Sequence, residues 1–228
     1  MDFATATATL VGNTGVSLME GLAFSPGGTL YGTDSSGRLY SINTSTAAAT
    51  QIGTTGQGDI EGLDFVGNTL VGSTFGSSPS SFFSIDIATA ATTLITSANV
   101  GVVRSLTDVD SNTALVINGS IGSEQSTFVN LTTGAITPIG PLNSVSGFIV
   151  AEDLGTDGVL YGLDSAGNAY SIDGTTGVST LIGDTGNQFF LDLSIPVAAT
   201  ATPEPSTFVL LAGAGLVFAG LRKRNYFR

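Results

Sequence analysis

The sequence contains no cysteine, no histidine and no tryptophan, and only six of its 228 residues are lysine or arginine. Without cysteine and histidine, the chain excludes disulfides, the usual zinc sites, a Ser-His-Asp triad and a Cys-His dyad. Charged residues make up 11% of the chain and the mean hydropathy is +0.37. Disordered chains combine high charge with little apolar surface, so this composition indicates a folded protein.

Basic residues are rarest in the first 200 positions, where two arginines, Arg38 and Arg104, stand against seventeen acidic residues. The formal charge of this region is therefore 2 − 17 = −15, and the remaining residues carry 4 − 1 = +3. Nucleic acids are bound through lysine and arginine, so the acidic body argues against a nucleic-acid partner. A solvated surface is the simplest interpretation of these charges.

What the chain does contain is a repeat, seen most clearly in the stretch from Leu160 to Gly183. This stretch predicts three short strands, at 160–162, 169–173 and 179–183, joined by turns rich in Gly, Ser and Thr. The aliphatic residue that closes the third strand recurs in steps of 41, 43, 44 and 43 residues, at Val11, Ile52, Ile95, Ile139 and Ile182. A fourth, more apolar strand follows each ending, at 21–24, 62–65, 105–109, 147–150 and 190–193.

Units of 40–45 residues with four strands each are typical of the blades of a β-propeller, in which neighbouring sheets bury each other's apolar faces. We therefore predict an all-β domain over residues 1–197, with four complete four-stranded blades. The strands left over at its two ends, Ala8–Gly12 and Phe189–Ile195, are expected to form a partial fifth blade. Either the ring closes imperfectly in this way, or the sequence is a fragment of a larger propeller.

One aromatic residue per unit stands in the middle strand, and these residues are Tyr40, Phe83, Phe128 and Tyr170. One aromatic at a constant position in each blade is what packing between blades requires. We interpret these side chains as core, with a binding platform as the alternative.

The candidate binding site lies at the mouth of the central channel, which the innermost strands line. Aligning the Gly-Leu pairs of these strands places five residues at equivalent positions: Glu20, Glu61, Arg104, Ser146 and Phe189. Two carboxylates and a guanidinium converging there suit a cation, sugar hydroxyl groups or a polar peptide. The alternative is a water-filled rim in which Glu20 and Glu61 bind backbone amides or pair with Arg104.

Aspartates in loops offer a second, weaker candidate. Residues 108–112 place oxygen atoms at alternate positions, as at the start of a calcium loop, but the glycine and the distal glutamate of such a loop are missing. Asp153, Asp157 and Asp164 are interpreted as acceptors within turns. We therefore expect no metal site and no cofactor.

The chain changes character after the repeats. Residues 198–206 form a linker of small residues and prolines, residues 207–221 are uncharged and mostly apolar, and residues 222–228 form a basic tail with Arg222, Lys223 and Arg224 at its start. Fifteen helical residues span about 22 Å, which is short of the ~30 Å hydrocarbon core, and flanking residues would extend them. We predict a transmembrane helix at 207–221 with a cytoplasmic basic tail, because basic residues favour the cytoplasmic side. The alternative is a buried hairpin helix.

Pro203, Glu204 and Pro205, followed by the apolar segment and the basic cluster, resemble the PEP-CTERM sorting signal of exopolysaccharide-producing Gram-negative bacteria. The resemblance implies export, anchoring in the membrane, recognition of Pro203–Pro205 by an exosortase-type membrane peptidase, and release to the cell surface or extracellular matrix. That family pairs the tail with an N-terminal signal peptide. Residues 1–4 do not fit one, so we expect the reading frame to extend upstream.

The sequence thus predicts a non-catalytic protein of the cell surface or extracellular matrix. Its propeller would be a structural module or would bind polysaccharide or envelope proteins. The alternative is an extracellular propeller hydrolase or lactonase that uses channel carboxylates, since Glu20 and Glu61 have the residue types for such chemistry.

Overall fold

The computed structural model describes residues 1–76, 78–119, 123–142, 149–186 and 192–196. The chain divides into two compact units, Met1–Ala198 and Ala199–Arg228. All described residues belong to the first unit. The predicted linker at 198–206, helix at 207–221 and basic tail at 222–228 lie outside them.

Four separate sheets make up the first unit, and each is an antiparallel meander of four consecutive strands. Blade 1 contains β1 (Met19–Phe24), β2 (Leu30–Asp34), β3 (Arg38–Ile42) and β4 (Ala49–Thr54). Blade 2 contains β5 (Ile60–Val66), β6 (Thr69–Thr74), β7 (Ser80–Ile85) and β8 (Thr92–Ala98). Blade 3 contains β9 (Val103–Asp110), β10 (Thr113–Asn118), β11 (Gln125–Asn130) and β12 (Ile136–Pro141). Blade 4 contains β13 (Ile149–Leu154), β14 (Leu160–Asp164), β15 (Asn168–Ile172) and β16 (Ser179–Asp184).

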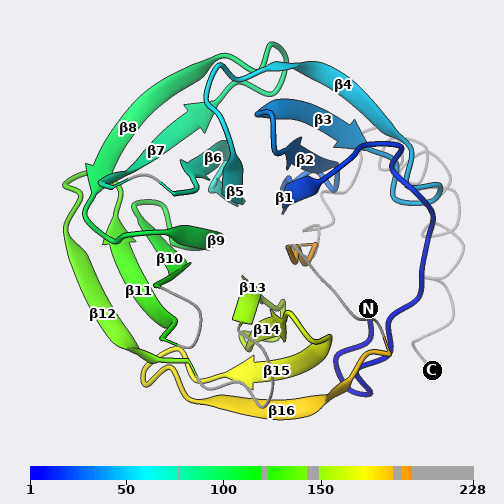
Figure 1. The fold of residues 1–228 in the computed structure, drawn as a ribbon, viewed down its shortest axis with the longest axis vertical. Helices are drawn as coiled ribbons and strands as arrows, with labels where there is room; N and C mark the ends of the chain where they lie inside the picture. Colours follow the sequence, from blue (N-terminus) through cyan, green and yellow to red (C-terminus); the bar gives the residue numbers. More distant parts are fainter. Residues whose placement is uncertain (77, 120–122, 143–148, 187–191, 197–228) are drawn as a thin grey trace, which may run out of the picture. The chain divides into compact units, whose positions relative to one another are not determined.

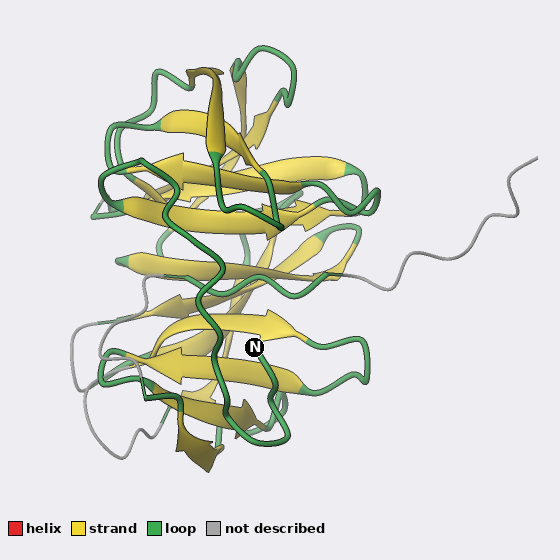
Figure 2. Ribbon diagram, turned by 90° about the vertical axis from the view of Figure 1, so that its right-hand side faces the viewer, coloured by secondary structure: helices red, strands yellow, loops and turns green. Residues whose placement is uncertain are grey.

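The blades stand around a common axis, with β1, β5, β9 and β13 innermost and β4, β8, β12 and β16 at the rim (Figure 1). The predicted all-β, propeller-like arrangement of four blades is confirmed, and no helix occurs in the described residues (Figure 2). Tight hairpins rest on glycines with positive φ, among them Gly28 (81°) and Gly158 (79°).

Apolar side chains pack between neighbouring blades, which is the arrangement that the repeat predicts. Leu39 of blade 1 lies in one cluster with Leu63 and Ile85 of blade 2. Val71 of blade 2 packs with Val116 of blade 3, and Ile117 of blade 3 packs with Tyr170 of blade 4. Each sheet therefore buries its faces against its neighbours, since one small sheet cannot cover both of its own.

The register corrects the predicted aromatic series. Tyr40, Phe83 and Tyr170 lie opposite a glycine of the second strand of their blades, but in blade 3 the equivalent residue is Thr127, opposite Val116. Phe128 is the next residue along and points to the other face of the sheet, because side chains alternate along a strand. The place of Phe128 in the series was wrong by one position, but its interpretation as core is confirmed, because the side chain packs against the cluster between blades 3 and 4.

The partial fifth blade is not confirmed. No strand is assigned to residues 8–12 or to 192–195, and residues 187–191 lie outside the description. The two segments nevertheless lie in the gap of the ring between blade 4 and blade 1, which we call position five (Figure 1). Ala6 and Leu193 pack there against Ala151 and Leu163 of blade 4.

Candidate functional site

Three of the predicted mouth residues occupy the same structural position in their blades. In each blade the register between the first two strands shifts near the start of the innermost strand and leaves one residue there unpaired; blade 3 has a second shift, at Val109. That residue is Glu20 in blade 1, Glu61 in blade 2 and Arg104 in blade 3. Such bulges re-aim a side chain out of the regular alternation, and in these blades the three side chains carry charge.

Blade 4 was predicted to place Ser146 at this position, and the register shows that this is wrong. β13 begins at Ile149, and the shift falls between Ile149 and Ala151, so the equivalent residue is Val150. The rim in blade 4 is therefore apolar at this point. Ser146 and Phe189 lie outside the described residues.

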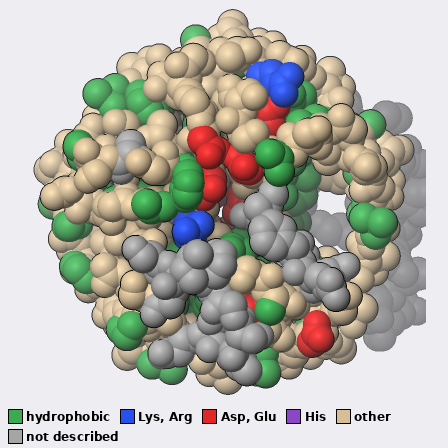
Figure 3. Space-filling model, in the orientation of Figure 1, with side chains coloured by type: hydrophobic (Ala, Val, Ile, Leu, Met, Phe, Trp, Pro, Cys, Tyr) green, Lys and Arg blue, Asp and Glu red, His purple; other side chains and the backbone are tan. Residues whose placement is uncertain are grey.

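A third carboxylate, Asp59, joins the two predicted glutamates. Oxygen atoms of Glu20, Asp59 and Glu61 all lie within 4.8 Å of one another. Asp59 precedes β5 by one residue and Glu61 by two, so in an extended chain both side chains point to the same side. This spacing could have revealed Asp59 from the sequence. Figure 3 shows acidic side chains gathered at the centre of this face, beside a basic one.

The crowding of carboxylates changes their proton affinity. Burial raises the pKa of Glu20 to about 8, and a hydrogen bond with Asp59 and the charges of Asp59, Glu61 and Asp34 act in the same direction. Burial and the charge of Asp59 raise the pKa of Glu61 to about 7, against the opposing charge of Arg104. The mouth therefore holds protons near neutral pH and offers hydroxyl donors as well as carboxylate acceptors.

Arg104 completes the mouth from the blade 3 side. Its guanidinium carbon lies 5.4 Å from the centre of the Phe75 ring, a cation–π distance. Its charge also lowers the pKa of Glu61. The guanidinium is thus held between an aromatic ring and a cluster of carboxylates, where it can donate hydrogen bonds to a bound group.

A second series of acids, Asp64, Asp108, Asp153 and Asp192, lies on the innermost segments, further along the chain than the mouth residues. Asp64 Oδ2 accepts from the Asp108 backbone N–H at 2.7 Å, and Asp192 Oδ2 accepts from the Leu22 N–H at 2.6 Å. Asp153, 7% exposed, accepts from the Ile195 N–H. These carboxylates link the innermost segments of neighbouring ring positions.

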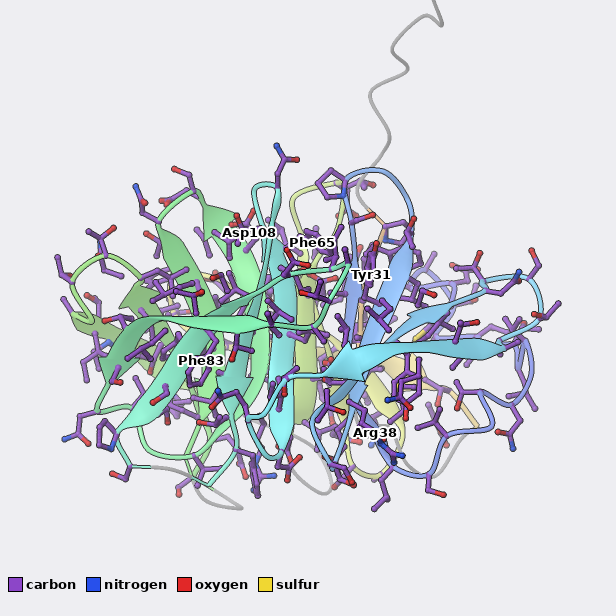
Figure 4. All side chains as sticks on the ribbon, turned by 90° about the horizontal axis from the view of Figure 1, so that it is seen from above. Tyr31, Arg38, Phe65, Phe83 and Asp108 are labelled. Carbon is purple, nitrogen blue, oxygen red and sulfur yellow. The ribbon has the colours of Figure 1, made fainter. Side chains whose placement is uncertain are left out.

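The carboxylate of Asp108 accepts from the Gly67 N–H of the neighbouring blade at 3.3 Å. The turn interpretation is wrong for one aspartate. Asp153 lies on β13 and not in a turn. The turn interpretation is confirmed for Asp157, which accepts from the Val159 N–H, and for Asp164, which accepts from the Ala166 N–H. In Figure 4, Asp108 and Phe65 lie toward one face of the unit and Arg38 toward the opposite face.

The fold and the convergence of charged side chains at its centre define a β-propeller-like protein with an acidic channel mouth. A chain in the crystal structure of a nidogen/laminin complex matches with a TM-score of 0.57 and 14% identity, over 82% of this chain and 71% of that one. The PQQ-bound form of an aldose sugar dehydrogenase from Streptomyces coelicolor matches with 0.56 and 10%, over 82% and 87%. A putative TolB from Agrobacterium tumefaciens matches with 0.50 and 15%, over 73% and 62%. At these identities the likeness concerns the fold alone.

The C-terminal residues indicate how the protein is exported and sorted. Residues 201–224 match the model of the PEP-CTERM protein-sorting motif, which confirms the resemblance seen in the sequence. The motif implies an exported protein that is anchored to the membrane at its C-terminus and sorted by an exosortase, itself a membrane protein. No curated protein matches the sequence. Within the ranges that the structure describes, no helix has the length and apolar character needed to cross a membrane.

Proposed function

We propose that this exported protein is a non-catalytic module of the cell surface or extracellular matrix, and that the channel mouth binds polysaccharide. The observation that carries the proposal is the set of equivalent bulges that bring Glu20, Glu61 and Arg104 to one rim. Side chains placed on the ends of rigid strands are held more precisely than side chains on loops.

The chemistry of the mouth suits a ligand rich in hydroxyl groups. Ionised carboxylates accept from pairs of hydroxyls, and the guanidinium of Arg104 donates to ring or glycosidic oxygens. A protonated Glu20, with its pKa of about 8, adds one donor to this set. The net negative charge of the body favours neutral or cationic polysaccharides over acidic ones.

The test is a glycan array probed with the full chain in mild detergent, followed by titration of each hit. We expect Arg104→Ala and Glu61→Gln each to weaken binding about tenfold or more, as loss of a buried charged hydrogen bond does. The control is Asp157→Asn, which removes an acid from an exposed turn. Binding that survives both mouth substitutions, or no binding to any glycan, would sink the proposal.

A second candidate is a hydrolase or lactonase, favoured by one observation. Glu20 has a pKa of about 8, and one of its oxygen atoms lies within 4.8 Å of a carboxylate oxygen of Asp59, so a carboxyl group that holds its proton near neutral pH has a second carboxyl group beside it. Under this alternative a glycan or lactone would be cleaved, and Glu20→Gln would abolish cleavage while leaving binding in place. Intact ligand after long incubation with the unaltered protein speaks for the binding module.

A further inference from the structure

Blades 3 and 4 leave a cavity of about 550 Å³ between them, and none of the described mouth residues lines it. Its walls are mostly apolar side chains: Leu115 and Phe128 of blade 3, and Leu154, Leu160 and Ile172 of blade 4. Leu154 remains 41% exposed, although it lies on an innermost strand. A cavity of this volume and lining suits a small organic molecule.

The equivalent place between blades 1 and 2 is filled by two aromatic rings. Tyr31 of β2 and Phe65 of β5 lie there with their ring centres 5.7 Å apart (Figure 4). Tyr31 and Leu115 each directly precede the second-strand residue that fixes the register of their blade. Phe65 and Leu154 each lie opposite a leucine that stands two residues before the glycine of the second strand. Two leucines therefore stand between blades 3 and 4 where two rings stand between blades 1 and 2.

A second aromatic pair lies on the other face of blade 4. Tyr161, the equivalent of Tyr31 in this blade, stacks on Phe3 with the ring centres 4.1 Å apart and an angle of 25° between the ring planes. Between blades 3 and 4, by contrast, Phe128 is the one aromatic residue among the described residues that line the cavity. Aromatic rings attract a second ring in stacked or tilted geometry. The cavity therefore has both the space and the stacking partner for a flat ring.

Acidic groups border this cavity, and no basic residue is among the described residues that line it. Hydrogen bonds from Thr175, first from its hydroxyl, lower the pKa of Asp173 to about 2, so this carboxylate is charged at neutral pH. Asp108 also lines the cavity, and its Oδ1 atom is buried without a hydrogen-bond partner in the described part of the chain. Both carboxyl groups favour a ligand with a positively charged N–H donor.

We propose that the cavity between blades 3 and 4 binds a small aromatic amine, with its ring beside Phe128 and its ammonium group toward Asp173 and Asp108. Burial of the ring supplies most of the affinity, and the carboxylates select a cation over a neutral or anionic molecule. The site shares no residue with the channel mouth. This proposal therefore stands whether or not the mouth binds polysaccharide.

The probe is tryptamine, an indole with an ammonium side chain. The protein contains no tryptophan, so indole emission comes from the probe alone. Tryptamine is titrated with the full chain in mild detergent, with the detergent alone as the blank, and we expect saturable 1:1 binding with a Kd of about 0.1–1 mM. Tryptophol, in which a hydroxyl replaces the ammonium group, should bind about three- to fivefold more weakly, and the anion indole-3-acetate more weakly still.

A first variant fills the cavity. Leu115→Tyr combined with Leu154→Phe gives this junction the aromatic pair that blades 1 and 2 contain, so the chain should keep its Tm while tryptamine binding falls at least tenfold. The matched control is Leu94→Phe, at an exposed position on β8, which should leave binding unchanged. Full tryptamine affinity in the double variant with its Tm retained overturns the proposal. Should the Tm fall, the charge variant decides alone.

This charge variant removes one carboxylate and keeps its turn. Asn130 accepts a turn N–H in blade 3 as Asp173 does in blade 4, so Asp173→Asn should fold normally. It should weaken tryptamine binding about three- to fivefold and leave tryptophol binding unchanged. Asp86→Asn removes the same charge from the equivalent turn of blade 2 and should change neither. Equal tryptamine affinity of these two variants overturns the proposal, as does equal binding of the three indoles or no binding of tryptamine.

Discussion

At the scale of single residues, Glu152 stands out because leucine occupies the equivalent position in blades 1 and 2. It lies opposite Gly162 in blade 4, where Leu22 and Leu63 lie opposite the equivalent glycines of blades 1 and 2. The side chain is 0% exposed, Oε2 accepts from Ser126 at 3.2 Å, and Oε1 has no partner. Burial raises its pKa to about 8.

This carboxyl should make stability fall with rising pH. Folding raises the pKa of Glu152 from 4.5 to about 8, because burial favours the protonated form. The stability that the protonated side chain contributes is therefore fully present below pH 4.5 and is lost as the pH rises through about 8. Glu152→Gln should therefore match the parent at pH 4 and exceed it at pH 9 by about 2–4 kcal/mol in free energy of unfolding. Urea unfolding at the two pH values measures this, with Asp157→Asn as the control that should gain no stability at pH 9, because the pKa of Asp157 is lowered and not raised. Parallel pH curves for parent and Glu152→Gln would contradict it.

Buried tyrosines anchor the turns of blades 1 and 4. Tyr170, 1% exposed, donates from its hydroxyl to Asp164 at 2.8 Å. Tyr170→Phe should lower the free energy of unfolding by about 1–2 kcal/mol, since it removes a hydrogen bond to a buried carboxylate. Tyr161→Phe removes a similar bond to Asp157 at an exposed site and should cost less than about 0.5 kcal/mol. Equal losses in chemical denaturation would show that burial does not set the difference.

At the scale of elements, outer strands approach the next blade so closely that they need glycine. A Cβ on Gly53 would lie 2.6 Å from a backbone oxygen, that of Thr89, which cannot move without shifting the turn. Gly53→Ala should cost about 2 kcal/mol or more, as overpacking does. Gly58→Ala, where no atom lies within 4 Å, is the matched control and should change stability by less than about 0.5 kcal/mol. The thermal midpoints of the two variants decide between these expectations.

Strands that alternate regularly between glycine-rich turns were predicted well from the sequence, and β14, β15 and β16 match within a residue or two. Prediction failed where several registers satisfied the pattern equally. Residues 147–151 are all glycine or apolar, so their sequence shows no alternation that would fix which side chains of β13 face the core or where the strand begins. A slip of one residue also moved Phe128 to the wrong face. The role of the second series of acids, Asp64, Asp108, Asp153 and Asp192, was not predicted. Their hydrogen-bond partners lie in neighbouring ring positions, which no local sequence pattern reveals.

At the scale of the whole molecule, the charge of −15 on the first 200 residues should make stability sensitive to salt. Like charges repel one another in the compact state. At physiological ionic strength the Debye length is about 8–10 Å, so salt weakens this repulsion. We expect Tm to rise by about 2–5 °C between about 10 and 150 mM NaCl. A differential scan at both concentrations measures this, and an unchanged or falling Tm would mean that attractive pairs such as Arg38–Asp34 outweigh repulsion.

The segment Pro203–Pro205 lies between the acidic body and the basic tail, and cleavage there should change the charge of the released protein. If an exosortase acts at Pro203–Pro205, the released form loses the apolar segment and the basic tail, and the acidic propeller is left without an anchor. In a host with an exosortase, intact mass of the surface-released protein should therefore exclude Phe227. Replacing Pro203, Glu204 and Pro205 with alanine should keep the full-length chain in the membrane fraction, whereas Glu61→Gln should be processed normally. A released form that retains Phe227 would contradict cleavage, because the tail would then have left the membrane intact.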